Sequence, residues 1–190
     1  MKRIFSAVLL TSLLAINAMA SESDQGKITK LETTVLNNET ILKYESYEVG
    51  TIGGSLDVKF TAMVITDPAK ASVVATGMKV TIIGDKNVTS SVYLDADEVK
   101  SLSDAVALIK LTSEKYATEK KEPYTELMYS SRGGFKFGYL NKGAGAGMFG
   151  SNSALFIRTP AMESILKDDE KRIGQMQSVI ADALFKMGSK

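Results

Sequence analysis

The side chains that could carry chemistry in this chain are those of Lys, Ser, Tyr, Asp and Glu, because its 190 residues include no His, Cys or Trp. This composition excludes Ser-His-Asp and Cys-His catalysis, zinc fingers, and haem or iron–sulfur ligation through those side chains. Nucleophilic catalysis by a Ser-Lys pair and glycoside hydrolysis by paired carboxylates stay open. Neither leaves a dependable sequence signature here, so we predict no catalytic residue, no cofactor and no metal ligand.

Three carboxylates fall within four consecutive positions, at Asp95, Asp97 and Glu98. A calcium loop of the helix-loop-helix type would require Asp or Asn at Val99 and Gly at Lys100, and both positions fail. The same residues fit the start of a helix, with Asp95 as the N-cap and Glu98 at N3 of a capping box. The spacing therefore predicts helix capping rather than metal binding.

The segment from Gly145 to Gly150 matches the G-x-G-x-x-G pattern of dinucleotide sites. That motif binds a pyrophosphate only between a strand and a helix of a βαβ unit. A strand-like segment follows it here, so we interpret residues 141–152 as a Gly-rich hairpin loop. The functional alternative is a flap beside a pocket.

An aromatic row, Phe135, Phe137 and Tyr139, shares one face of a predicted strand. Such side chains most simply fill the core, but a cavity in front of them would suit an apolar ligand. Beyond the N-terminal segment, Arg132 and Arg158 are the arginines outside the predicted helices, and Arg132 is interpreted as a turn residue. The candidates for ligand binding are therefore Phe137, Tyr139 and Arg158.

Residues 1–20 contain the three parts of a secretory signal peptide in order. Lys2 and Arg3 form a basic start, an apolar stretch follows, and Ala18-Met19-Ala20 gives a small-x-small cleavage pattern. The apolar stretch is shorter than the about 20 residues of a spanning helix. We therefore expect cleavage after Ala20 and a periplasmic or secreted chain of residues 21–190, without a transmembrane segment.

The charge of the expected exported chain is close to zero. Loss of Lys2 and Arg3 leaves 21 basic and 22 acidic side chains, a net charge of −1. Nucleic-acid-binding domains usually show a basic balance, so we predict no nucleic-acid partner.

The elements that must position these residues begin with a series of strands. Leu56 to Thr66 places apolar side chains at every second position, which is the period of a half-buried strand. Residues 72–83 and 88–94 flank a Gly-Asp-Lys-Asn loop and predict an antiparallel hairpin. Further strands are predicted over residues 27–36 and 41–49.

Two amphipathic helices are predicted. From Asp95 to near Tyr116, apolar side chains recur at steps of three and four. The second helix is predicted to run from Thr159 as N-cap, with Pro160 at N1, to a stop at Gly188.

Between these helices, residues 124–130 and 135–140 flank a Ser-Arg-Gly-Gly turn and predict a second hairpin. Residues 153–158 form the last predicted strand. A local similarity links residues 90–95 with 154–159, because each is a short apolar strand that leads into a predicted helix. Internal duplication and shared strand-to-helix chemistry both explain it.

Strands that come in runs, rather than alternating with helices, indicate an α+β fold. We predict a single domain over residues 21–190, built as one strongly twisted antiparallel sheet of about eight strands with both helices on its apolar face. The predicted function is that of an exported, non-catalytic protein that binds a small apolar molecule or a protein partner in the cell envelope. The alternative is a hydrolase that uses carboxylates or a Ser-Lys pair.

Overall fold

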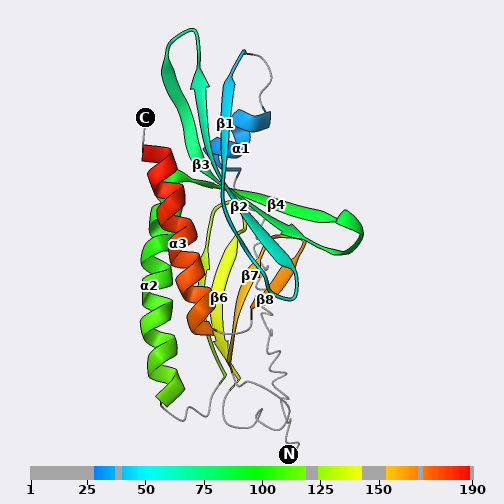
Figure 1. Ribbon diagram of the computed structural model, residues 1–190, viewed down its shortest axis with the longest axis vertical. Helices are drawn as coiled ribbons and strands as arrows, with labels where there is room; N and C mark the ends of the chain where they lie inside the picture. The colour runs from blue at the N-terminus through cyan, green and yellow to red at the C-terminus, as the bar shows by residue number, and fades with distance from the viewer. Residues whose placement is uncertain (1–27, 37–39, 119–123, 143–152, 167–168, 189–190) are drawn as a thin grey trace, which may run out of the picture.

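The computed structural model describes residues 28–36, 40–118, 124–142, 153–166 and 169–188. Within them the chain is an α+β fold of two four-stranded antiparallel sheets and three α-helices (Figure 1). The first sheet contains, in spatial order, β1 (Lys43–Ile52), β2 (Asp57–Asp67), β3 (Ser72–Ile83) and β4 (Thr89–Asp95). The second contains β5 (Thr125–Ser130), β6 (Lys136–Asn141), β7 (Ser153–Arg158) and β8 (Glu163–Leu166). The helices are α1 (Lys30–Leu36), α2 (Ala96–Thr118) and α3 (Asp169–Gly188), with a short 3-10 turn η1 (Asp85–Asn87).

The prediction of a single eight-stranded sheet was wrong, while the α+β class is confirmed. Strands that are consecutive in the sequence pair with each other, as short connections favour. Helix α2, with 23 residues, separates β4 from β5, and these strands form the edges of two different sheets. The alternating pattern identifies strands and their buried faces, but it carries no information on which strand edges pair.

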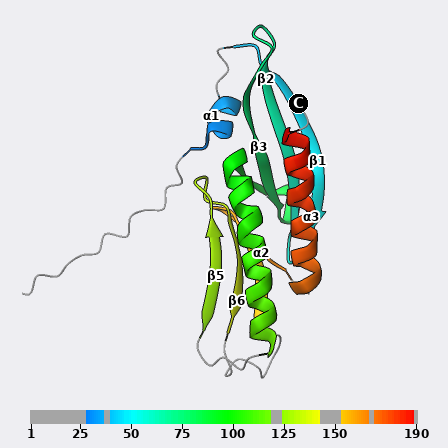
Figure 2. The same ribbon diagram turned by 90° about the vertical axis from the view of Figure 1, so that its left-hand side faces the viewer.

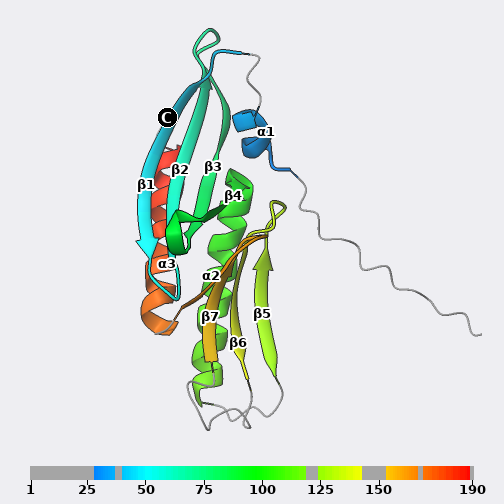
Figure 3. The same cartoon turned by 90° about the vertical axis from the view of Figure 1, so that its right-hand side faces the viewer.

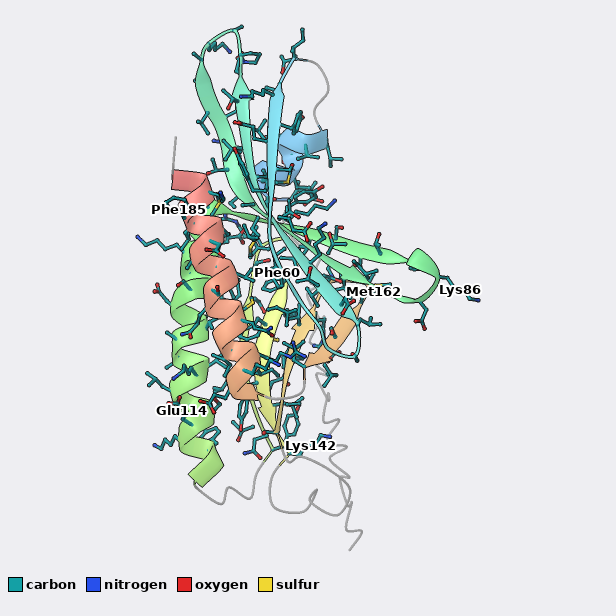
Figure 4. All side chains as sticks on the ribbon, in the orientation of Figure 1. Phe60, Lys86, Glu114, Lys142, Met162 and Phe185 are labelled. Carbon is teal, nitrogen blue, oxygen red and sulfur yellow. The ribbon has the colours of Figure 1, made fainter. Side chains whose placement is uncertain are left out.

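The strands predicted over residues 56–66 and 72–94 are confirmed by β2 and by the β3–β4 hairpin. The expected inner face of β2 is fully buried at Val58, Phe60 and Ala62. The β3–β4 hairpin extends away from the rest of the fold, with Lys86 at its tip and Phe60 near the centre of the molecule (Figure 4).

Helices α2 and α3 lie side by side and antiparallel, and each covers the sheet of the other half (Figure 2). Helix α2 follows the first sheet but packs on β5 and β6 as well as on β3 and β4. Helix α3 follows the second sheet but packs mainly on β1 and β2. One continuous hydrophobic core results. Its large, fully buried side chains include Phe60, Met78, Leu94, Leu102, Phe135, Phe137 and Leu155.

The N-terminal described segment is helix α1, where the sequence predicted a strand over residues 27–36. The hydroxyl of Thr29 accepts a hydrogen bond from the backbone N–H of Glu32 (3.0 Å) and caps the helix. These two residues have the spacing of a capping box, a helix signal that the β-branched residues of the segment obscure. Leu31 anchors α1 to the outer face of the first sheet, opposite the long helices (Figure 3). Its buried neighbours are Met63, Ile65 and Ala75.

Helix α3 begins at Asp169, later than the predicted start at Thr159, and ends at Gly188 as predicted. Thr159 instead closes a turn: its N–H donates to the carbonyl of Met162 (2.8 Å), and the Met162 N–H donates to its hydroxyl (3.2 Å). A proline after Thr starts a turn as readily as a helix, because its fixed φ suits the second turn position. The chain then forms β8, a strand that the sequence did not predict.

The order of elements repeats, because four strands followed by a helix occur twice between β1 and α3. The local similarity between residues 90–95 and 154–159 matched β4 with β7. In the structure β4 leads directly into α2, whereas β8 rather than β7 precedes α3. The two halves therefore share the same order of elements, but the strand that precedes the helix of the second half is β8 and not the matched strand β7.

Two predictions concern residues outside the described part of the chain: the signal peptide over residues 1–20 and the Gly-rich loop, of which residues 143–152 are not described. Among the described helices, none combines the length and the apolar character that a membrane span requires.

Candidate functional site

A cleft of about 250 Å³ opens between α2, the start of α3 and the second sheet. In Figure 4, Glu114 marks its α2 side. The side chains that line it are Lys110, Ser113, Glu114, Tyr139, Ser153, Glu170 and Ile173. Because α2 and α3 run antiparallel, the second half of α2 meets the first turn of α3, and this meeting brings residues far apart in sequence to one site.

The floor of the cleft is aromatic and apolar. Tyr139, from β6, is only 2% exposed, and Ile173, from the first turns of α3, is 1% exposed. The ring of Tyr116, at the end of α2, lies 6.3 Å from that of Tyr139 with a tilt of 42°, which is a favourable aromatic geometry. The core therefore holds this floor rigidly, and the side chains of Tyr139 and Ile173 present only a small apolar area to the cleft.

The rim of the cleft is charged. The ammonium of Lys110 donates to a carboxylate oxygen of Glu114 (2.6 Å), one turn later on α2. This hydrogen bond, together with the negative charges of Glu114 and Glu170, raises the pKa of Lys110 above its usual value. Lys110 therefore keeps its proton at neutral pH.

Ser113, one turn after this lysine on α2, contributes a hydroxyl to the lining of the cleft. Its Oγ donates to the backbone carbonyl of Lys110 (2.8 Å) rather than to the ammonium. A Ser-Lys nucleophile requires a neutral lysine that accepts the serine proton. The arrangement at Ser113 and Lys110 is therefore suited to binding and not to nucleophilic attack.

The three predicted ligand-binding residues are not brought together. Tyr139 lies in the floor of the cleft, and Phe137, on the same face of β6, is fully buried in the core. Arg158 lies on the opposite face of the second sheet, where its guanidinium donates to Glu163 (3.0 and 3.1 Å) and sits 5.1 Å from the ring centre of Phe156. Strand alternation accounts for this, because Arg158 pairs with Lys136, the neighbour of Phe137 in the sequence.

The carboxylates at the start of α2 serve helix ends, but not in the predicted way. Glu98, 5% exposed, accepts a hydrogen bond from the N–H of Asp95 (2.9 Å), which confirms half of the capping box. The carboxylate of Asp95 does not turn to its own helix. It accepts from the N–H groups of Lys30 (3.0 Å) and Leu31 (2.8 Å) and so caps α1.

Arg132 completes this cluster from the β5–β6 turn. Its guanidinium donates to both oxygens of Asp97 (2.8 and 3.0 Å) and to Asp95 (3.0 Å), and its backbone N–H donates to Glu98 (2.6 Å). The guanidinium lowers the pKa of Asp97, and the carboxylates raise the pKa of Arg132. Within the described residues, no cluster of acidic side chains has the arrangement of a metal site. The cluster therefore joins the two halves of the fold.

Sequence reasoning reached Tyr139 but missed the rest of the cleft. The Lys110–Glu114 spacing is readable as a one-turn ion pair on a predicted helix. No local signal places Glu170 and Ile173 beside it, since only the antiparallel packing of α2 on α3 does so. No protein-family model, curated protein or solved structure matches the chain. A functional proposal must therefore start from the cleft.

Proposed function

We propose that this protein is exported and binds a small, largely apolar molecule in the cleft between α2, α3 and the second sheet, without catalysing a reaction on it. The observation that carries the proposal is the floor of Tyr139 and Ile173 at the base of an open cleft. Ligand sites typically combine apolar walls with a few placed polar groups, and the rim of the cleft supplies such groups.

The rim favours a molecule with one polar donor. Among the described residues of the lining, two carboxylates, those of Glu114 and Glu170, accompany one ammonium, that of Lys110. A hydroxyl or amine on the ligand would find an acceptor there while its apolar part lies at the base of the cleft, next to Tyr139 and Ile173. The volume of about 250 Å³ lies just below the common range for ligand pockets, which limits the ligand to a few rings or a short chain.

Two features support binding over hydrolysis by a Ser-Lys pair. Lys110 holds its proton beside Glu114, and the hydroxyl of Ser113 is committed to the α2 backbone. Export is supported by the signal-peptide pattern of residues 1–20.

The test is a fluorescence titration with N-phenyl-1-naphthylamine, an uncharged apolar dye whose emission rises in apolar surroundings. Ser113→Phe fills the cleft, and we expect it to weaken dye binding by about tenfold or more. Ser101→Phe is the matched control, because Ser101 also lies on α2 and bonds to a backbone carbonyl one turn earlier, but lies outside the cleft. Equal dye affinity in both variants, or no dye binding by the unmodified protein, would reject the cleft as the site.

A native mass spectrum of protein purified from its source tests the same proposal without a surrogate ligand. We expect a retained small molecule that is released by Ser113→Phe and kept by Ser101→Phe. The mass of the denatured chain tests export separately: cleavage after Ala20 leaves a chain that begins at Ser21, and a chain that retains residues 1–20 would contradict export by cleavage.

A further inference from the structure

The outward face of α2 carries an apolar pair that the fold does not use. Leu108 and Leu111 are 63% and 66% exposed and lie one helical turn apart. The buried stripe of the same helix, which faces the core, contains Val99, Leu102, Val106 and Ile109. An exposed leucine pair on the outer face of a long helix contributes nothing to the packing of one chain, and contiguous exposed apolar surface often marks an interaction site.

Charges of opposite sign flank this pair. Asp104 lies one turn before Leu108, and Lys115 lies one turn after Leu111. Both charged residues are exposed, and the steps of four, three and four keep all four side chains on one face of the helix. We refer to Asp104, Leu108, Leu111 and Lys115 as the α2 outer stripe.

The α2 outer stripe is complementary to itself when reversed. Its four positions are symmetric about the midpoint between Leu108 and Leu111. When a second α2 runs antiparallel across the first, Leu108 of one copy faces Leu111 of the other, and Asp104 of one copy faces Lys115 of the other. A parallel arrangement would instead place like charges opposite each other. Two-fold interfaces require this kind of self-complementary surface.

From this geometry we propose that the protein forms a symmetric dimer through the α2 outer stripe, with a second copy of the chain as the occupant. The leucines form the apolar centre of the interface, and two Asp104–Lys115 pairs fix its antiparallel register. A membrane surface fits less well, because the stripe carries an acidic residue where a membrane-binding helix concentrates Lys and Arg.

Helix α3 leaves room for the second copy. It lies beside α2 in the same layer (Figure 2), and its outward positions Gly174, Ser178 and Ala181 are small and exposed, whereas Phe185, one turn later on the same face, is large and 69% exposed. A Cβ added at Gly174 would meet nothing within 4 Å, so the helix surface is open there. The partner chain can therefore approach the helix layer closely around Gly174. The small apolar centre implies a dimer that dissociates on dilution, since stable interfaces usually bury more area than two leucines from each chain provide.

Sedimentation equilibrium of the periplasmically expressed protein, from about 1 µM to about 1 mM, tests the proposal. We expect a monomer–dimer equilibrium. Combined Leu108→Glu and Leu111→Glu substitutions should weaken dimerisation by about 100-fold or more. Val88→Glu is the matched control, because Val88 is equally apolar and 57% exposed but lies at the tip of the β3–β4 hairpin. Circular dichroism should show that both proteins stay folded, since the changed side chains lie on the surface.

A charge swap tests the register. Asp104→Lys alone should weaken dimerisation by about tenfold, because lysines then face each other at both ends. Adding Lys115→Asp to the same chain should restore most of the affinity. A protein that stays monomeric up to about 1 mM, a control as strongly affected as the leucine variant, or a double variant no better than Asp104→Lys would each overturn the proposal. So would a monomeric chain that pairs through this stripe with a different protein.

Discussion

The two halves of the molecule share an architecture and differ in how they protect their outer faces. Each half is a four-stranded antiparallel sheet followed by a long helix, and both contribute their inner faces to one core. The outer face of the first sheet is covered by α1, which Leu31 anchors. In the described part of the second half no helix takes that place. There Phe156 lies fully buried, with the guanidinium of Arg158 above its ring.

The difference shows that the two sheets bury their inner faces together in one core, whereas the outer face of each sheet is covered separately. Helix α2 packs on both sheets and α3 packs mainly on the first, so the inner face of each sheet is covered in part by the helix that follows the other sheet. The outer faces are independent of this exchange. Each is closed by one large side chain over a glycine: Leu31 lies over Gly77 in β3, and Phe156 lies over Gly138 in β6.

The largest expected effect tests whether the halves form one cooperative unit. Phe60 in the first half and Phe137 in the second are both fully buried in the shared core. We expect Phe60→Ala and Phe137→Ala each to lower the free energy of unfolding by about 3–5 kcal/mol, because each leaves a cavity in the same core. The free energy of unfolding is measured by urea denaturation, monitored by circular dichroism and by tyrosine fluorescence.

In both variants a single transition should shift as a whole, with the two probes coincident. Two separate transitions, of which Phe60→Ala moves only one and Phe137→Ala only the other, would show that the halves fold independently. The exchange of helices between the halves would then have no energetic consequence.

The next effect compares the two outer faces. A Cβ at Gly77 would overlap the carbonyl oxygen of Leu94, and a Cβ at Gly138 would overlap both the ring of Phe156 and, less closely, the carbonyl oxygen of Leu127. We expect Gly77→Ala and Gly138→Ala to destabilise the protein by about 1–3 kcal/mol, the former more, because the backbone carbonyl that a Cβ would meet lies closer at Gly77 than at Gly138. Gly174→Ala on α3 is the control and should stabilise by up to about 1 kcal/mol, since alanine favours a helix. Thermal unfolding ranks the three, and a reversed order for the two sheet glycines would contradict the comparison.

The sequence predicted the elements whose signals are local. Strand β2 follows from alternation at Val58, Phe60 and Ala62, and the capping function of Glu98 follows from its spacing to Asp95. Strand β8 was missed because its four residues are too few to show a period. The partner of the Asp95 carboxylate was missed because helix α1 lies 64 residues earlier in the chain, and no local pattern connects the two.

The candidate site divides in the same way. Tyr139 was predicted from its place in an aromatic row, and alternation on β6 correctly puts it on the inner face. The rest of the cleft depends on how two helices pack, which the amphipathic stripes of α2 and α3 leave open. Arg158 illustrates the cost of choosing a residue by type alone, because strand parity places its side chain on the opposite face.

A smaller effect distinguishes the contact that holds α1 from the contact that covers the outer face of the second sheet. Asp95→Ala removes the acceptor for the N–H groups of Lys30 and Leu31. We expect a loss of about 1 kcal/mol and faster amide hydrogen exchange confined to residues 30–36. Arg158→Ala, the counterpart in the second half, removes an exposed ion pair and a cation above Phe156, and we expect about 0.5 kcal/mol without any change in α1. Equal exchange in α1 for both variants would mean that Asp95 does not hold the helix.

The smallest effect concerns the contact of Asp97, on the helix that follows the first sheet, with Arg132, on a turn of the second. Arg132 lowers the pKa of Asp97, so the folded state favours the ionised carboxylate. The stabilisation is therefore present above the unfolded pKa of about 3.9 and is lost as the pH falls through the lower folded value. Because the pair is exposed, we expect no more than about 1 kcal/mol, further reduced by salt.

Asp97→Asn should remove this acid-dependent part and leave the stability below that pH unchanged, as urea unfolding between pH 7 and pH 2.5 would measure, at about 25 °C. Asp67→Asn is the matched control. Its pKa is also lowered, by Lys70, but that pair lies within the β2–β3 turn of one sheet. If Arg132 couples the halves, Arg132→Met should abolish the effect of Asp97→Asn and leave that of Asp67→Asn intact. An unchanged effect of Asp97→Asn in the Arg132→Met background would show that the carboxylate stabilises only its own helix start, and the Asp97–Arg132 pair would then not contribute to joining the two halves.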